Sequence, residues 1–376
     1  MTKHLTLLVL AAVALAGCEQ DQGISNPARA SIDAHAFADG GTGPGAVYTL
    51  TNETTGNALA VFARAADGTL SPMGTVATGG TGTGDGLGSQ GAVVLSDDGR
   101  WLFAVNAGSN DVSVFRVDPQ GPSLASRTPS GGTLPISLTV HGDVLYVLNS
   151  GGAGNITGFR VRPDGELVRI AGATRPLSGS GVAPAEVAFS PDGRSLVVTE
   201  KATNLLDIYA VDQDGVASGP RSVASAGGTP FGFAFGLRNL LFVTEAADPG
   251  SASSYILDRG GDPRVVSGAV LTHQGAPCWA VVTNDGRFGF TGNGAGSVSA
   301  FTIGRDGSLS LLAAAAATIT GGVNDIALSA DSRYLYVLQV GGTPAVHAFR
   351  VQDDGSLTSL GPVGGLPAGT RGLAAR

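Results

Sequence analysis

The stretch FSPDGRSLVVTEK, residues 189–201, consists of a polar turn, a short apolar run and a carboxylate at Glu200. The same pattern returns as LSDDGRWLFAVNA at 95–107, VTNDGRFGFTGNG at 282–294 and LSADSRYLYVLQV at 328–340. Glycine in such a turn supplies a positive φ angle, and the aspartate accepts hydrogen bonds from nearby backbone amides. The repetition indicates one strand–turn–strand unit that recurs along the chain.

A second pattern follows the first at a regular distance, as in DVSVFRVDPQGPSL, NITGFRVRPDGELV and AVHAFRVQDDGSLT. It is an alternating strand with an aromatic residue, a polar turn and a further strand. The aromatic residue occurs seven times, with a mean spacing of about 48 residues, at Phe62, Phe115, Phe159, Tyr209, Tyr255, Phe301 and Phe349. A period of this length, made only of strand and turn signals, predicts an all-β, seven-bladed β-propeller with four-stranded blades.

The two ends of the repeat region predict how the ring closes. The region begins in VYTLTN, a second strand with no first strand before it, and the chain finishes in GTRGLAAR, a first strand with no second strand after it. The C-terminal strand should therefore complete the first blade and leave no exposed sheet edge. We expect one propeller domain over 46–376, in which even the alanine run at 313–318 is a strand, because register outweighs helix propensity.

Composition narrows the functional classes. The chain has 376 residues, 43% of them hydrophobic, with 59 glycines and a formal net charge of -8. This composition suits a globular protein with many tight turns, and we expect it to be a monomer. The acidic balance and the lack of a basic cluster argue against nucleic acid as a partner.

The N-terminus predicts export. Lys3 and His4 precede LTLLVLAAVALAG, an apolar run that is too short to span a bilayer but suits a signal peptide over 1–17. The run ends in Leu-Ala-Gly-Cys18, which resembles the lipobox of bacterial lipoproteins and implies lipidation of Cys18. Residues 18–45 then form a tether, and the lipid is the only predicted contact with the membrane, at the periplasmic or outer surface of the cell envelope. The alternative is a chance cysteine in an ordinary export signal.

Polar residues end the second strand of every repeat and should form a ring around the channel mouth. They are Asn52, Asn106, Asn149, Glu200, Glu245, Asn293 and Gln339. The amides can simply cap strand ends or bond to the adjacent blade, or they can bind substrate, as we predict for Asn149 and Asn293. Glu200 and Glu245 add charge where the scaffold needs only an acceptor, so they are candidates for either structure or function.

The loops into the first strands supply further candidates at the same mouth. Glu186 and Asp325 add acids, Trp279 adds a flat surface, and His273 is the only histidine that the repeat register places on this face. Together with Asn149 and Asn293, these residues form the predicted substrate-binding set. Arg371 and Arg175 are possible counter-charges.

The repeats FSPDGRSLVVTEK and LLDIYAVDQDG resemble the seven-bladed lactonase family, which includes 6-phosphogluconolactonase and 3-carboxymuconate-cyclising propellers. PISLTVHGDVLYVLNSGGAGNITGFRV and CWAVVTNDGRFGFTGNGAGSVSAF are similar to exported members of that family. The chain departs from the family where its lactonases read Pro-Arg-His, because it has Pro184-Ala185-Glu186 there. A family Pro-His-x-His is likewise replaced by PISL at 135–138, so the usual histidine and arginine side chains are missing.

Two classes of function follow from these residues. The first is an exported lactonase or cyclase that opens or forms a lactone of a sugar acid or a muconate-type acid. Glu200 would then act as base, Glu245 as its partner, and Arg371 or Arg175 as the cation for the oxyanion. The alternative is a non-catalytic, lipid-anchored propeller that binds a glycan, a small acid or a protein. We expect no metal or other cofactor, although the oxygen ligands at the mouth leave a calcium ion as a third alternative.

Overall fold

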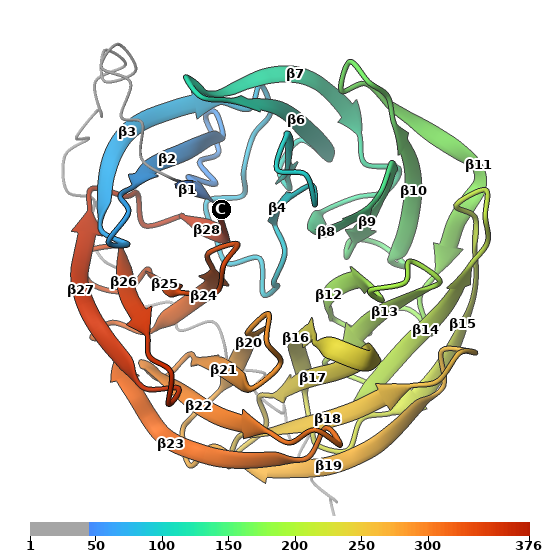
Figure 1. Ribbon diagram of the computed structural model, residues 1–376. Coiled ribbons are helices and arrows are strands. Elements are labelled where there is room, and N and C mark those ends of the chain that lie inside the picture. Colours follow the sequence, from blue (N-terminus) through green and yellow to red (C-terminus); the bar gives the residue numbers. More distant parts are fainter. Residues whose placement is uncertain (1–44) are drawn as a thin grey trace, which may run out of the picture.

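The computed structural model describes residues 45–376, which form seven four-stranded antiparallel sheets arranged as the blades of a ring (Figure 1). The predicted seven-bladed β-propeller is confirmed. The predicted signal peptide, Cys18 and nearly all of the tether lie outside the described residues.

Each blade consists of four strands, which follow one another from the channel outward. Blade 1 contains β28 (Arg371–Ala375), β1 (Gly45–Leu50), β2 (Ala58–Arg64) and β3 (Leu70–Ala77). Blade 2 contains β4 (Val93–Leu95), β5 (Trp101–Asn106), β6 (Asp111–Asp118) and β7 (Gly121–Pro129). Blade 3 contains β8 (Pro135–His141), β9 (Val144–Asn149), β10 (Asn155–Val161) and β11 (Leu167–Pro176).

The other four blades have the same order. Blade 4 contains β12 (Pro184–Phe189), β13 (Ser195–Glu200), β14 (Leu205–Val211) and β15 (Ala217–Ala224). Blade 5 contains β16 (Pro230–Phe235), β17 (Leu240–Glu245), β18 (Ser251–Leu257) and β19 (Pro263–Leu271). Blade 6 contains β20 (Pro277–Val282), β21 (Phe288–Asn293), β22 (Ser297–Ile303) and β23 (Leu309–Thr318). Blade 7 contains β24 (Val323–Leu328), β25 (Tyr334–Gln339), β26 (Ala345–Val351) and β27 (Leu357–Gly364).

The ring closes as the two chain ends predict. β28 pairs with β1, with Val47 opposite Ala375 and Tyr48 opposite Ala374, so the C-terminal strand becomes the innermost strand of blade 1. The alanine run lies in β23, as predicted from the register. The described chain has one short helix, the 3-10 turn η2 (Leu237–Asn239), and no helix in this part is long and apolar enough to cross a membrane.

The core lies between neighbouring blades. All six residues of β13 are buried, because this strand is covered on both faces by adjacent blades. The aromatic residues that recur in the third strands are buried as well, and the hydroxyl of Tyr209 donates to Pro176 O of the preceding blade at 2.9 Å. Each repeat therefore contributes one large apolar side chain to an interface between blades, where truncation to alanine typically costs about 3–5 kcal/mol.

The alternation of strand direction gives the disc two different faces. One face, which we call the turn face, carries the hairpin turns that join the first strand to the second and the third to the fourth. In the turn after β12, Asp192 Oδ1 accepts hydrogen bonds from Ser190 Oγ and from the Arg194 amide, and Gly193 has φ 69°. The opposite face, which we call the mouth face, carries the loops from second to third strands and the connections between blades. The DGR motifs therefore lie away from the channel mouth.

Candidate functional site

The seven innermost strands surround the central opening of the disc (Figure 1). Several of them begin with a β-bulge, seen as a register shift between Pro184 and Glu186 in β12 and between Pro277 and Trp279 in β20. The same shift precedes Asp325 in β24. The third residue of each of these strands is thus set at an equivalent depth below the mouth face, and the sequence places Glu186, Trp279 and Asp325 there.

The mouth itself is closed by a segment from the connection between blades 1 and 2. This connection runs over 78–92, and its part 86–90, which we call the plug, enters the central opening, where Figure 1 shows the chain between β3 and β4 turning inward. Gln90 makes three of the hydrogen bonds that attach the plug. Its side-chain amide donates to Ala280 O at 2.8 Å and accepts from Ala280 N at 2.9 Å, while its backbone N–H donates to Ala185 O at 3.2 Å. The plug thereby joins blades 4 and 6.

Three further hydrogen bonds hold the plug against the wall. Ser89 Oγ donates to Ile136 O at 2.8 Å, and Trp279 Nε1 donates to Ser89 O at 3.1 Å. Lys201 Nζ donates to Gly88 O at 2.5 Å and lies 4.7 Å from the centre of the Phe231 ring. The plug therefore contacts blades 3, 4 and 6, and it covers Trp279 of the predicted substrate-binding set.

A small cavity remains between the plug and the wall. It has a volume of about 10 Å³, which is room for about one water molecule. Its lining residues are Gly86, Leu87, Gly88, Ser89, Trp279, Asn324, Arg371 and Gly372. Two residues of the predicted site, Trp279 and Arg371, are thus brought together at the mouth.

Arg371 is the only charged residue in the wall of that cavity. Its Nη1 donates to Thr370 O at 2.7 Å and to Ala368 O at 3.2 Å, so the guanidinium is held by the backbone of its own loop. Trp279 is almost fully buried and packs edge-to-face against Phe231, with 5.7 Å between ring centres. The predicted flat surface therefore lies underneath the plug in this structure.

Glu186 and Asp325 are buried carboxyl groups of the channel wall, in blades 4 and 7, whose inner strands flank the opening (Figure 1). Glu186 Oε2 accepts from Phe233 N at 2.6 Å, and Asp325 Oδ1 accepts from Ile326 N at 2.8 Å. Asp325 Oδ2 makes no hydrogen bond of normal geometry with the described residues. A buried oxygen without a partner costs stability, so this carboxyl group requires an explanation.

Both channel carboxyls favour the protonated form. Burial raises the pKa of Glu186 well above its usual range, the Phe233 amide opposes the shift, and the charge of Asp325 adds to it. Burial also raises the pKa of Asp325 well above its usual range, and the amides of Ile326 and Leu373 oppose this only in part. The charge of Asp325 acts on Glu186, so the two groups interact, and burial favours the protonated form of both.

Glu200 lies inside blade 4. Its side chain is fully buried, and its oxygens accept from Ser178 N at 3.0 Å, Ser178 Oγ at 2.5 Å and Thr203 Oγ1 at 2.7 Å. Its carboxyl neighbour is Asp207 of β14, which the sequence analysis did not single out. The structure therefore pairs Glu200 with an acid of its own blade, in contacts that join it to the loop from blade 3.

Glu245 is enclosed in the same way in blade 5. Oε1 accepts from Gly227 N at 2.7 Å and from Ser253 Oγ at 2.5 Å, and Oε2 accepts from Ser251 Oγ at 2.6 Å. The side chain has no exposed surface. No hydrogen-bond partner is shared between Glu245 and Glu200, and neither residue lines the cavity at the mouth.

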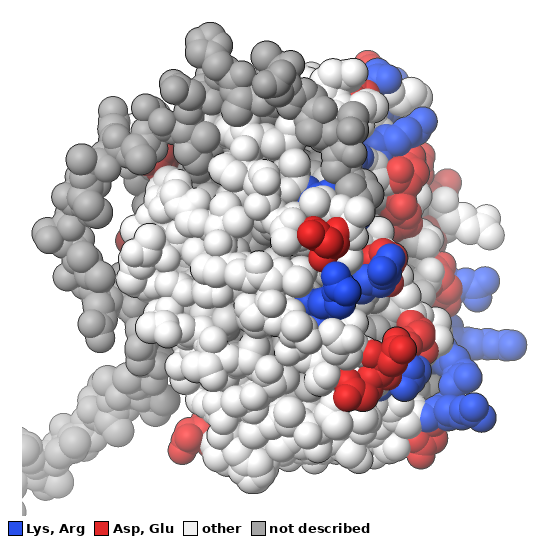
Figure 2. Space-filling view, turned by 60° about the vertical axis from the view of Figure 1, so that its left-hand side comes forward, with Lys and Arg blue, Asp and Glu red and all other residues white. Residues whose placement is uncertain are grey.

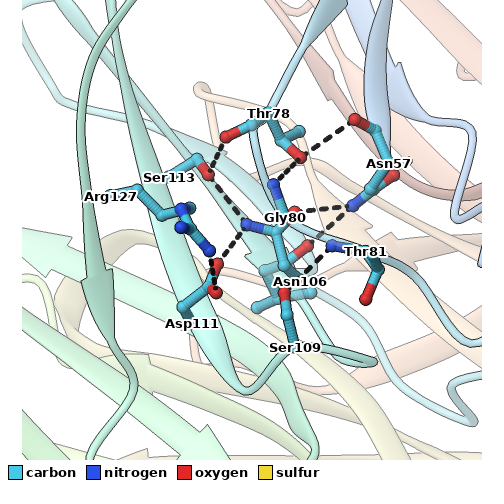
Figure 3. A network of polar contacts seen from close by, with 10 residues as sticks. Asn57, Thr78, Gly80, Thr81, Asn106, Ser109, Asp111, Ser113 and Arg127 are labelled. Atoms are coloured by element: carbon cyan, nitrogen blue, oxygen red, sulfur yellow. Dashed lines mark hydrogen bonds and ion pairs between the residues drawn. The ribbon is translucent and has the colours of Figure 1, made fainter. Parts of the chain in front are cut away.

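The asparagines that end second strands make comparable contacts. In blade 2, the Asn106 amide donates to Asp111 Oδ1 at 2.6 Å and to Ser113 Oγ at 2.8 Å, and its Oδ1 accepts from Asn57 of blade 1 at 3.0 Å. Arg127 completes this network through an ion pair with Asp111 at 2.7 Å (Figure 3). These bonds match the structural alternative that the sequence left open for the amides.

Asn149 and Asn293 are fully buried in blades 3 and 6. Asn149 Nδ2 donates to Asn155 Oδ1 at 3.0 Å, and Asn293 Nδ2 donates to the hydroxyls of Ser297 and Ser299 at 2.9 and 2.8 Å. The predicted binding residues therefore divide into three groups, with these two inside blades and Glu186, Trp279 and Asp325 at the channel. The third group is His273, which is exposed in the loop from blade 5 to blade 6.

Two features of the site were missed from sequence. The plug could have been suspected from the length of the connection that contains it. Residues 78–92 separate β3 from β4, whereas only 130–134 separate β7 from β8. Asp207 could have been found by aligning the repeats. It is the third residue of β14, and the third residues of β6, β18 and β22 are Ser113, Ser253 and Ser299. Within 45–376 no group of three or more His, Cys, Asp or Glu side chains is placed to hold a metal ion.

Comparison with known proteins agrees with this architecture. Residues 44–182 match the family model described as Lactonase, 7-bladed beta-propeller. No curated protein matches the sequence. Among solved structures, the periplasmic gluconolactonase of Pseudomonas aeruginosa superposes with a TM-score of 0.69 at 18% identity, covering 88% of this chain and 99% of that one.

Two further solved structures have the same shape. A Bacteroides fragilis protein described as a candidate 6-phosphogluconolactonase gives a TM-score of 0.70 at 17% identity, covering 89% of this chain and 99% of that one. A Lactobacillus plantarum protein gives a TM-score of 0.70 at 17% identity, over 88% of this chain and 99% of the other. At these identities the likeness shows the fold. Together with the match over 44–182, it agrees with the resemblance noted in the repeats: the chain is a seven-bladed β-propeller, and its residues 44–182 are similar to the lactonase family.

Proposed function

We propose that this protein hydrolyses a lactone of a sugar acid at the channel mouth, with Glu186 and Asp325 as the proton-transfer pair and Arg371 as the cation for the oxyanion. The observation that carries the proposal is Oδ2 of Asp325, a buried oxygen without a hydrogen bond of normal geometry, which lies near a second buried carboxyl, Glu186. The small cavity at the mouth adds Arg371 and Trp279 in one wall. This assignment replaces Glu200 and Glu245, because their oxygens are occupied by donors inside the blades.

The chemistry requires one proton on the pair. The ionised carboxyl takes a proton from water as the water oxygen attacks the lactone carbonyl carbon. The negative charge that develops on the carbonyl oxygen is stabilised by the Arg371 guanidinium. The protonated carboxyl then gives its proton to the ring oxygen as the carbon–oxygen bond breaks, so the pair again holds one proton and the product is a hydroxy acid.

Substrate access requires movement of the plug. A cavity of about 10 Å³ holds a water molecule but no sugar lactone. The connection 78–92 is rich in glycine, with positive φ angles at Gly79, Gly84, Gly88 and Gly91. Loops of this kind commonly open and close over enzyme sites.

The closed mouth is also the observation that favours the second candidate function, a non-catalytic propeller that binds a glycan, small acid or protein. A turnover assay separates the two functions. The wild type, Glu186→Gln, Asp325→Asn and a matched control, Glu53→Gln, are each incubated with δ-gluconolactone in a pH-stat. Glu53 is an exposed carboxylate of the mouth face. Loss of at least 100-fold in kcat/KM in the two channel variants, with the control unchanged, is the expected result. Absence of turnover by the wild type, or full activity of both channel variants, contradicts the proposal.

We also propose that the protein is exported as a monomer and anchored through lipid on Cys18. The support is the apolar run that precedes Leu-Ala-Gly-Cys18 in the sequence. Metabolic labelling with a radioactive fatty acid tests this, with Cys18→Ser as control. Label in the wild type alone, in the membrane fraction, is expected. Equal label in both proteins, or none in either, contradicts the anchor.

A further inference from the structure

Charged side chains are distributed very unevenly over the two faces of the disc. Figure 2 shows them gathered along one side, while most of the remaining described surface in view has almost none. The turn face carries acids and arginines in nearly every hairpin turn. The fourteen loops of the mouth face in the described chain contain only four charged residues, which are Glu53, Asp85, Lys201 and Asp248. Three of these four are acids.

Recognition of a phosphate group requires the opposite arrangement. Phosphate esters are bound by charge-assisted hydrogen bonds, usually from arginine forks or several lysines. Arg371 is the single cation of the cavity wall, and its Nη1 already donates to two backbone carbonyls. Lys201 Nζ donates to Gly88 O of the plug. The mouth therefore lacks a cluster of cations that could compensate a dianion.

The channel acids would also act against a phosphate. Glu186 and Asp325 lie in the wall below the mouth, and Asp85 lies in the connection that carries the plug. A dianion brought close to these groups raises the free energy of their ionised forms, in a site from which water is largely excluded. The hydrolysis proposed above needs one of them ionised. A phosphate group on the substrate would therefore weaken its binding and slow its hydrolysis.

An uncharged, hydroxylated ring has the partners that it needs. The cavity wall contains Ser89, Asn324, Trp279 and the glycines Gly86, Gly88 and Gly372. Hydroxyls, amides and backbone groups hydrogen-bond sugar hydroxyls without requiring charge, and an aromatic ring packs against the apolar side of a sugar. We propose that the mouth selects an uncharged, hydroxyl-bearing lactone such as an unphosphorylated aldonolactone and discriminates against its phosphate ester. The inference rests on the proposed function and assigns its substrate class.

The test combines binding with turnover, so that the two proposals can fail separately. Gluconolactam, an uncharged analogue that resists hydrolysis, and its 6-phosphate are titrated into the full mature protein by calorimetry at pH 7 and fixed ionic strength. At least tenfold tighter binding of gluconolactam is expected. Equal or tighter binding of the phosphate, or binding of neither compound, overturns the inference. Binding of gluconolactam without turnover of δ-gluconolactone overturns the proposed function alone.

A cation added at the mouth sharpens the test. Asn324→Arg places a second guanidinium in the cavity wall, and Asp354→Arg places one on the turn face as the matched control. The first variant should reduce the preference for the uncharged analogue at least fivefold, and this gain for the phosphate should shrink as salt is added. The control should leave the ratio unchanged. An Asn324→Arg variant that folds, as judged by its melting curve, and shows an unaltered ratio contradicts charge as the basis of selection.

Discussion

Replacing Asp207 by asparagine should remove a large part of the pH dependence of this propeller's stability. Asp207 is fully buried in β14, where its Oδ1 accepts from Ser222 Oγ at 2.5 Å and its Oδ2 has no donor of normal geometry in the described chain. Burial raises the pKa of Asp207 to about 7, with a further contribution from the hydrogen bond and charge of Glu200 and against the lowering effect of Ser222. An aspartate in an unfolded chain has a pKa of about 3.9.

The sign follows from proton counts. Between pH 4 and pH 7 the folded protein keeps a proton on Asp207 that the unfolded chain has lost, so stability falls as pH rises through this window. A shift of about 3 units corresponds to about 4 kcal/mol, complete by about pH 7, and this is an upper limit for a pair of interacting groups. Asparagine resembles the protonated acid, because its NH₂ can donate to Glu200 while its oxygen accepts from Ser222.

Urea unfolding of the wild type and Asp207→Asn at pH 4.5, 6 and 8 measures the effect. Relative to the wild type, the variant should gain about 2–4 kcal/mol between pH 4.5 and pH 8. Asp354→Asn is the control, because the Ser356 hydroxyl and amide lower the pKa of that exposed group, and its removal should give a small change of opposite sign. If Asp207→Asn keeps the wild-type dependence on pH, no proton is shared in this blade and the reasoning is refuted.

Three other changes follow from single contacts. Gln90→Ala removes both bonds to Ala280, so hydrogen exchange at the amides of 86–90 and of Ala280 should quicken at least tenfold, and unchanged protection would show that the plug is held by other contacts. Tyr209→Phe removes the bond to Pro176 O and should cost about 1 kcal/mol in urea unfolding with kcat/KM unchanged. Gly193→Ala should cost about 1–3 kcal/mol, because φ 69° is unfavourable with a Cβ, and a neutral result would contradict a structural role for the DGR turn.

Most of the fold could be predicted because each blade has its own local sequence signals. In most blades the turn after the first strand has glycine or a small residue at positive φ, and every third strand has a large aromatic residue between blades, so both signals recur at a fixed period. The closure by β28 followed from a missing first strand at one end and an extra one at the other. Each of these inferences used contacts that are close in sequence or repeated in every blade.

For Glu200 and Glu245, the repeat register predicted the position along the strand but not the position across the blade. These residues end second strands, and a first strand lies between each second strand and the channel. Their side chains therefore meet loops and hydroxyls of the blades, whereas Glu186 and Trp279, on first strands, reach the channel wall and the cavity. The plug could not be located from sequence, because its contacts with Ala185 and Ala280 join segments separated by 95 and 190 residues.

Asp325 differs from Glu245, a buried acid of blade 5, in a way that bears on function. Glu245 has a donor for each of its oxygens, so its burial is compatible with the scaffold alone. Asp325 keeps an oxygen without a hydrogen bond of normal geometry, although a small residue serves at the corresponding place in other blades, such as Ser137 in blade 3 and Gly232 in blade 5. A buried oxygen without a partner typically costs about 1–3 kcal/mol, and the ring does not need it to close. The cost of keeping Asp325 beside Glu186 is therefore an argument for the chemistry proposed at the mouth, in which a proton is held and released.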